Sequence, residues 1–340
     1  MLVLKSSCIV PLRRNVTRSV ISPNFRRTLQ TGTAAEETEQ CFIEGLSGDD
    51  KGVIQRLLQL VSVILYIGQI EHYQLNRFLR IGISILCINR PKAKNALSRK
   101  LVESFRKAVG LLKHDNETRV VLLKSMVQGS FCAGADLKER AAMSADEVKQ
   151  FLHTVRVSFH ELETLPIPTI ALIDGVALGG GLELALCCDL RVAGEHAKVG
   201  LPETKLAIIP GAGGTQRLSR LIGLAKAKEL IYTGRILNAQ QALKEGIVNY
   251  AAKEGSGYQL ALNLAREILP SGPVALRMAK VAIDHGSQLD LDAGLDLEQS
   301  CYAQVIPTED RIEGIRGKTT PCIQGSLNPT SLYANQFGNR

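Results

Sequence analysis

The chain has 340 residues, of which 45% are hydrophobic and only 4% aromatic, with no tryptophan. That is enough apolar material for one large packed domain or two small ones, with a core built from Leu, Ile, Val and Ala. The formal net charge is +8, but six basic residues precede the first acidic residue, Glu36. The remaining +2 gives no indication of a large anionic partner.

The first 35 residues are basic, contain Ser and Thr, and carry no Asp or Glu. This composition is typical of a mitochondrial transit peptide, and Pro11 together with the interspersed arginines argues against a secretory signal. A disordered basic tail would have a similar composition. We therefore predict a transit peptide over residues 1–35 and a location in the mitochondrial matrix.

Strand and helix patterns alternate along the middle of the chain. Apolar, β-rich runs predict strands at 83–90, 119–124, 169–174 and 190–193. Amphipathic spacing predicts helices at 98–114 and 144–165, and Ser144 with Glu147 forms the pattern of a capping box. From Gly223 onward the pattern is mostly helical, at 225–233, 239–245, 258–269, 273–285 and 292–302. This order indicates an α/β fold with a helical C-terminal part.

Two segments do not fit this order. Residues 53–81 contain a broken apolar run that is too short for a membrane span. They could form a helix, but they fall where two strands should be joined by a short turn. The tail after Gly314 is polar and aperiodic, which predicts disorder.

A small-residue turn and a glycine-rich turn are candidates for binding an anion through the backbone. Small residues fill 131–136, and Gly179, Gly180 and Gly181 open a predicted helix. Free N–H groups from two such turns would form an oxyanion hole. The eight cysteines form no C-x-x-C pair and no His lies at metal-ligand spacing from them, so we predict reduced thiols and no metal site.

Two glutamates stand in unusual surroundings. Glu183 lies between Leu182 and Leu184 in an apolar helix, where an unpaired carboxylate would be costly. A glutamate stabilised by the helix dipole is the alternative. Glu203 follows Pro202 in a turn, and a solvated loop glutamate is its alternative.

Three segments together carry a family resemblance: residues 131–140 (FCAGADLKER), 177–188 (ALGGGLELALCC) and 200–218 (GLPETKLAIIPGAGGTQRL). They resemble the enoyl-CoA hydratase/isomerase, or crotonase, family over roughly residues 83–314. Within it, residues 301–304 and 307–311 are most similar to the mitochondrial methylglutaconyl-CoA hydratase branch, which includes an AU-rich-RNA-binding relative.

The resemblance implies a crotonase-like spiral of ββα units with a helical C-terminal trimerisation region, assembled as a homotrimer or a dimer of trimers. The expected organisation is a core at 36–270 with an atypical insertion at 53–81. A helical region at 271–314 and an atypical tail at 315–340 follow.

The resemblance also implies the site residues. The oxyanion-hole N–H groups fall on Ala135 and Gly180, and the acid/base carboxylates on Glu183 and Glu203. The residues expected along the coenzyme A path are Lys92, Ala93, Ala133, Asp136 and Leu137. Coenzyme A is part of the substrate, and no separate cofactor is expected.

The presence of both glutamates favours hydration of an enoyl-CoA. Overall similarity favours 3-methylglutaconyl-CoA, converted to 3-hydroxy-3-methylglutaryl-CoA in leucine degradation. The acyl pocket is expected near Met143, Val148 and Phe151, whose identities do not reveal specificity.

Three alternatives remain open. One is a general short-chain enoyl-CoA hydratase of fatty-acid oxidation. Another is RNA binding, which has less support because Glu103 interrupts the basic positions Arg99 and Lys107. The third is that the 53–81 insertion and the tail, from a retained intron and an alternative exon, leave the chain inactive.

Overall fold

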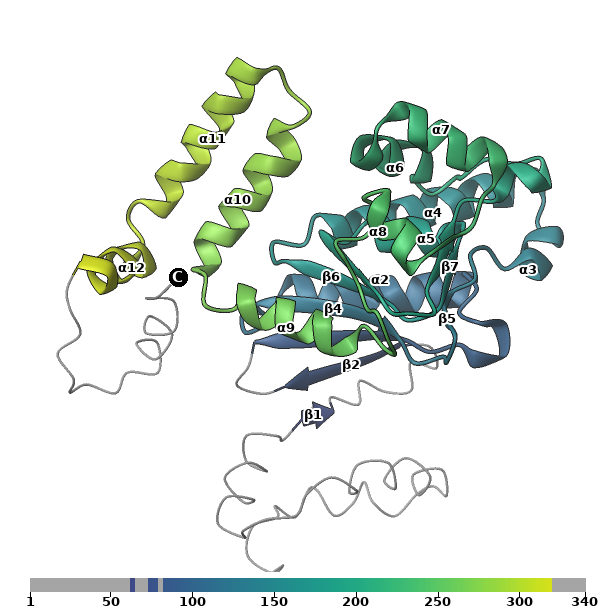
Figure 1. Cartoon of the computed structure of the whole chain (residues 1–340), viewed down its shortest axis with the longest axis horizontal. Coiled ribbons are helices and arrows are strands. Elements are labelled where there is room, and N and C mark those ends of the chain that lie inside the picture. Colours follow the sequence, from purple (N-terminus) through teal and green to yellow (C-terminus); the bar gives the residue numbers. More distant parts are fainter. Residues whose placement is uncertain (1–61, 65–72, 79–81, 320–340) are drawn as a thin grey trace, which may run out of the picture. The chain divides into compact units, whose positions relative to one another are not determined.

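The computed structural model describes residues 62–64, 73–78 and 82–319 (Figure 1), all within a unit that spans 59–340. The transit peptide predicted at 1–35 lies outside the described residues. So do residues 320–340 of the tail and those parts of the 53–81 insertion that flank its two strands.

The larger sheet has the strand order β1-β2-β3-β4-β6-β8-β11 within the described part of the chain. Its strands are β1 (Ser62–Ile64), β2 (Tyr73–Phe78), β3 (Ile83–Ile88), β4 (Val120–Ser125), β6 (Thr169–Ile173), β8 (Leu190–Ala193) and β11 (Tyr250–Ala251). The first three strands pair antiparallel, and those from β3 to β11 pair parallel. Residues 62–64 and 73–78 are thus strands, which excludes a helix at those positions of the insertion.

A smaller sheet has the strand order β10-β9-β7-β5. It is formed by β5 (Ser130–Cys132), β7 (Val176–Leu178), β9 (Lys198–Gly200) and β10 (Leu237–Asn238). The first three of these are parallel neighbours. The sequence patterns did not predict this sheet, and the turn expected at 131–136 begins inside β5.

Each repeat of the chain adds one strand to each sheet and then a helix. The pairs β4 and β5, β6 and β7, and β8 and β9 are each followed by helix, which is the predicted spiral of ββα units. The helices that follow are α3 (Leu137–Ala141), α4 (Ala145–Glu163), α5 (Gly180–Leu186), the 3-10 helix η2 (Glu203–Leu206) and α6 (Gly214–Ile222).

Both faces of the larger sheet are covered. Leu86 and Ile88 of β3 pack in the main core with α2 (Arg99–Lys113) and α4. Ile83 and Ile85 pack on the opposite face with α9 (Tyr258–Ile268). Strands buried on both faces have continuous apolar sequences, which is why these strands were predictable.

Local capping fixes the two long helices of the main core. The Ser98 hydroxyl accepts the Leu101 N–H at the start of α2. Ser144 and Glu147 form the predicted capping box of α4. Each cap satisfies an N–H group that the first turn of a helix leaves without a partner.

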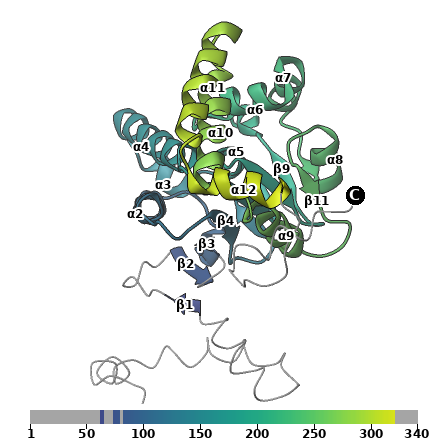
Figure 2. The same ribbon diagram turned by 90° about the vertical axis from the view of Figure 1, so that its left-hand side faces the viewer.

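The remaining helices are the 3-10 helix η1 (Pro91–Ala93), α7 (Leu224–Thr233), α8 (Ala239–Lys244), α10 (Pro273–Gly286), α11 (Leu291–Val305) and α12 (Glu309–Thr319). α10 and α11 lie side by side (Figures 1 and 2), in contact at Gly286 and Gly294. Disorder was predicted after Gly314, but α12 continues to Thr319, so residues 315–319 correct that expectation.

Candidate active site

The predicted site residues follow the carboxyl ends of three parallel strands in the smaller sheet. Ala135 follows β5, Gly180 follows β7, and Glu203 follows β9. Neighbouring parallel strands end at the same edge, so residues far apart in sequence meet there. This edge is where open α/β sheets bind ligands.

The turns that carry Ala135 and Gly180 touch each other. Gly134 has a φ of +92°, and a Cβ on it would lie 2.7 Å from the Leu178 carbonyl oxygen and 3.4 Å from the Gly180 nitrogen. Only glycine fits a left-handed backbone at so close an approach. The sequence therefore places small residues here because the two turns pack backbone against backbone.

Both candidate oxyanion-hole N–H groups lack a protein acceptor among the described residues. Leu97 donates its N–H to the Gly134 carbonyl and accepts the Asp136 N–H, so the intervening Ala135 N–H points away from Leu97. Gly180 is the first residue of α5, whose N–H has no carbonyl one turn earlier to bond. Within the described part of the chain, neither N–H donates to a protein acceptor.

Glu183 is buried, with 3% of its surface exposed, and its carboxylate is held by the loop before α6. Its Oε1 accepts the N–H groups of Ala212 at 2.8 Å and Gly214 at 2.7 Å. Burial raises the pKa of Glu183, while these two N–H groups oppose the rise. The carboxylate is therefore desolvated but retains two donors that favour its ionised form.

Glu203 turns its carboxylate toward the same site. Its Oε1 lies 2.9 Å from the position of a Cβ on Gly179, the residue before Gly180. Its Oε2 is buried and has no hydrogen-bond partner among the described residues. Burial, together with the negative charge of Glu183, raises the pKa of Glu203 to about 7. It is thus not the solvated loop glutamate considered from the sequence.

The two carboxylates consequently differ in their affinity for a proton. Glu183 has two backbone donors, whereas Oε2 of Glu203 has no hydrogen-bond partner in the part of the chain that the structure describes. Like charges in one desolvated site resist ionising together, so a single proton prefers Glu203 near neutral pH. The site therefore brings together a carboxyl group with two backbone donors and a second carboxyl group with a pKa raised to about 7.

A positioning network that the sequence reading missed surrounds the loop that holds Glu183. Arg217 donates two hydrogen bonds to Glu163, each 2.7 Å long, and one to the Ala212 carbonyl. Arg156 donates to the Gly211 carbonyl. The only sequence signal was that Arg217 is the next-to-last residue of the third motif.

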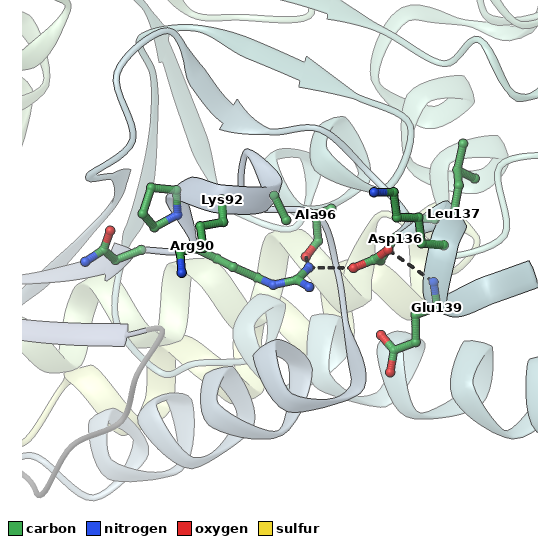
Figure 3. Close-up of a pocket in the computed structure, with 11 residues that line it drawn as sticks. Arg90, Lys92, Ala96, Asp136, Leu137 and Glu139 are labelled. Carbon is green, nitrogen blue, oxygen red and sulfur yellow. Dashed lines mark hydrogen bonds and ion pairs between the residues drawn. The ribbon is translucent and has the colours of Figure 1, made fainter. Parts of the chain in front are cut away.

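A pocket beside the oxyanion turn contains most of the predicted coenzyme A residues. Lys92, Ala93, Asp136 and Leu137 line it together with Ala135 (Figure 3), whereas Ala133 is not among its lining residues. The sequence reading missed Arg90, which also lines the pocket and pairs with Asp136 at 2.8 Å.

That ion pair organises the pocket wall. Burial acts to raise the pKa of Asp136, but the bonds from Arg90 and from the Glu139 N–H outweigh it and lower the pKa. As an ionised N-cap, Asp136 fixes the start of α3 (Figure 3). Lys92 and Lys138 also line the pocket and give its wall positive charge.

The basic positions of α2 are largely paired with glutamates. Arg99 bonds Glu147 at 3.0 Å, and Lys107 bonds Glu103 at 2.7 Å. Arg106 bonds Glu161. These pairs reduce the positive charge that the helix presents, and RNA binding stays an untested alternative.

Other sequence expectations concern cysteines, metals and membranes. The cysteines in the described ranges are free and buried, as predicted: Cys87, Cys132, Cys187, Cys188 and Cys301. The same ranges contain no cluster of three or more His, Cys, Asp or Glu that could hold a metal ion. No helix among the described residues has both the length and the apolar sequence needed to cross a membrane.

Comparison with known proteins gives consistent matches. The sequence model of the family described as enoyl-CoA hydratase/isomerase matches residues 80–321. The chain is 54% identical to a human mitochondrial methylglutaconyl-CoA hydratase over 238 residues, covering 69% of this chain and 70% of the relative. It is 52% identical to mouse mitochondrial enoyl-CoA hydratase domain-containing protein 2 over 251 residues, covering 72% and 85%.

The solved structures give the same result. The crystal structure of an enoyl-CoA hydratase from Bacillus anthracis superposes with a TM-score of 0.71 at 43% identity, covering 75% of this chain and all of that one.

Proposed function

The chain belongs to the enoyl-CoA hydratase/isomerase family, and we propose that it adds water across the C2=C3 bond of an enoyl-CoA. We take 3-methylglutaconyl-CoA as its preferred substrate and 3-hydroxy-3-methylglutaryl-CoA as the product. The names of the 54% identical relatives support this substrate. The observation that carries the hydration chemistry is the pairing of Glu183, with two N–H donors, and Glu203, with an unpartnered oxygen.

In this mechanism the substrate thioester oxygen accepts the N–H groups of Ala135 and Gly180. Negative charge develops on that oxygen as C3 is attacked, and donors already in place stabilise it without reorganising. The same bonds draw electrons from the C2=C3 bond. The turn packing of Gly134 against Leu178 and Gly180 sets the spacing of the two donors.

The two glutamates exchange protons with opposite ends of the double bond. Glu183 takes a proton from water as the water oxygen bonds to C3, and Glu203 gives its proton to C2. One water is thereby consumed, and the proton left on Glu183 returns to Glu203 through solvent. A carboxylic acid with a pKa of about 7 is well matched to proton transfer at neutral pH.

The coenzyme A portion of the substrate is placed in the pocket beside the oxyanion turn. Lys92 and Lys138 would bind its phosphates, and Leu137 would contact its apolar chain. We extend the path to Ala133, which is exposed and precedes the pocket residue Ala135 by two positions. No cofactor beyond the coenzyme A of the substrate is required by these steps.

We also propose an oligomer, a homotrimer or a dimer of trimers, located in the mitochondrial matrix. α10 buries no side chain and α11 buries only Cys301, while Ile283, Leu291 and Tyr302 are more than half exposed. Apolar helices of this kind need a partner. The basic composition of residues 1–35 and the mitochondrial relatives support the location.

The test is the loss of enoyl thioester absorbance when the purified protein is mixed with 3-methylglutaconyl-CoA or crotonyl-CoA. A higher kcat/KM on the branched substrate is the expected result. Turnover of crotonyl-CoA alone would support the hydration mechanism but contradict the proposed substrate. The chain would then be a general short-chain enoyl-CoA hydratase. No turnover of either would contradict the proposal.

A further inference from the structure

Two buried side-chain polar atoms lack a hydrogen-bond partner among the described residues, and both belong to the active-site region. One is Oε2 of Glu203, which the proposed chemistry uses. The other is Nε of Arg140, which it does not use. A buried donor without an acceptor costs roughly 1–3 kcal/mol, so such an atom calls for a ligand.

Arg140 lies close to the reacting groups because of its place on α3. That short helix starts two residues after Ala135, and its first turn is capped by Asp136 at the pocket wall. Arg140 is in the last turn, where its N–H bonds the Asp136 carbonyl at 2.8 Å. The guanidinium is near enough to Glu183 for their charges to interact.

The guanidinium contacts an aromatic ring and makes no ion pair within the described part of the chain. Its central carbon lies 5.4 Å from the ring centroid of Phe151 on α4, which is a cation–π contact. Arg140 forms no ion pair with any residue in the described ranges. By contrast, Arg217 and Arg156 near the same loop both have oxygen acceptors at 2.7 Å or less.

The position of Arg140 relative to the substrate follows from the proposed function, on which this inference rests. The thioester oxygen is held at Ala135 and Gly180, and C3 lies against Glu183. The next residue after Phe151, Leu152, meets the Gly211 loop that leads to the Glu183 donors, at 3.2 Å from a Cβ built on Gly211. Because the charge of Arg140 reaches Glu183 and its guanidinium contacts Phe151, these two residues border the Glu183 side of the site, where the acyl chain continues beyond C3.

We propose that Arg140 binds a carboxylate at the distal end of the acyl group and so selects enoyl thioesters that carry a second carboxylate. A guanidinium in a cation–π contact can still donate from its N–H groups, and these match a carboxylate in geometry and charge. The ligand would also satisfy the unpartnered Nε atom.

The experiment uses glutaconyl-CoA and crotonyl-CoA, which differ only by the terminal carboxylate. In Arg140→Met, the ratio of kcat/KM for glutaconyl-CoA to that for crotonyl-CoA should fall roughly 10- to 100-fold, the value of a charged hydrogen bond. Lys138→Met on the same helix is the matched control. It removes a cation from the pocket proposed for coenzyme A, which both substrates share, so the ratio should stay within about twofold.

Three outcomes would overturn the assignment while leaving the hydratase in place. The first is an unchanged ratio in Arg140→Met. The second is an equal loss on both substrates with a shifted pH profile, which would mean that Arg140 only adjusts the charge of Glu183. The third is no preference of the wild-type protein for either substrate.

A binding measurement keeps the inference testable if the variant does not fold or if no substrate turns over. The wild-type protein should bind glutaryl-CoA more tightly than butyryl-CoA by roughly 10-fold or more in calorimetry. Equal affinities would contradict the role of Arg140. Failure of turnover with intact selective binding would contradict the proposed function alone.

Discussion

The Glu183 carboxylate accepts the Gly214 N–H over 2.7 Å at a point where residue 214 has no room for a side chain. A Cβ on Gly214 would lie 3.0 Å from both Cγ and Oε1 of Glu183. The glycine therefore allows the backbone to approach the carboxylate as a hydrogen-bond donor. This contact links the second sequence motif (177–188) to the third (200–218), and it orients the carboxylate of the proposed base.

Replacing Gly214 with Ala should displace Glu183. We expect kcat to fall roughly 10- to 100-fold with little change in KM, because small misplacements of a reacting group are costly. Steady-state kinetics on the preferred substrate would measure this. Gly110→Ala is the matched control, since Gly110 lies on the exposed face of α2 with nothing within 4 Å of its Cβ position. A Gly214→Ala enzyme as active as Gly110→Ala would show that this contact does not position Glu183.

Neutralising either glutamate should remove one proton-transfer step. Glu183→Gln and Glu203→Gln are each expected to lower kcat roughly 10²- to 10⁴-fold. Thermal melting of the same samples would confirm that both variants fold. Near-wild-type turnover in a folded Glu183→Gln protein would refute its assignment as the base.

The pH dependence of hydration should report the proton on Glu203. Because its pKa is raised to about 7, the fraction of the acid form falls as pH rises through that value, and kcat for hydration should fall with it. A pH–rate profile from about 5 to 9 would show this limb. If kcat falls by the same factor over this pH range in Glu203→Gln, the titrating group is a different residue.

The pH dependence of protein stability should also report the Glu203 carboxyl group, and its direction follows from the raised pKa. The folded pKa of Glu203 lies above its ordinary value of 4.5, so the favourable contribution of its protonated form is present at low pH. That contribution is lost as pH rises from about 4.5 through about 7. The wild-type Tm should therefore fall across this window relative to that of Glu203→Gln. A Tm difference between the two proteins that stays constant with pH would contradict the raised pKa.

Much of the larger sheet and its helices could be predicted from local sequence. β3, β4 and β6 are buried on both faces, so their continuous apolar runs identify them without knowledge of their neighbours. Ser98 and Ser144 identify helix starts because their hydroxyls bond N–H groups three residues away. The three motifs likewise identified the family, which the comparisons confirmed.

The smaller sheet could not be predicted in this way. β5, β7 and β9 have three residues each, which is too short for a periodic pattern, and they exist because they pair with one another. Their pairing brings Ala135, Gly180 and Glu203 to one edge. No spacing along the chain contains that information.

The sequence by itself determined the candidate site residues: two glutamates, and glycines at turns that must approach each other closely. Only the tertiary structure decided how they differ. It gave Glu183 two backbone donors from Ala212 and Gly214. Among the residues that the structure describes, it left Oε2 of Glu203 and Nε of Arg140 without hydrogen-bond partners. The reason is physical, because the charge state of a buried group depends on desolvation and on partners that folding brings from distant parts of the chain.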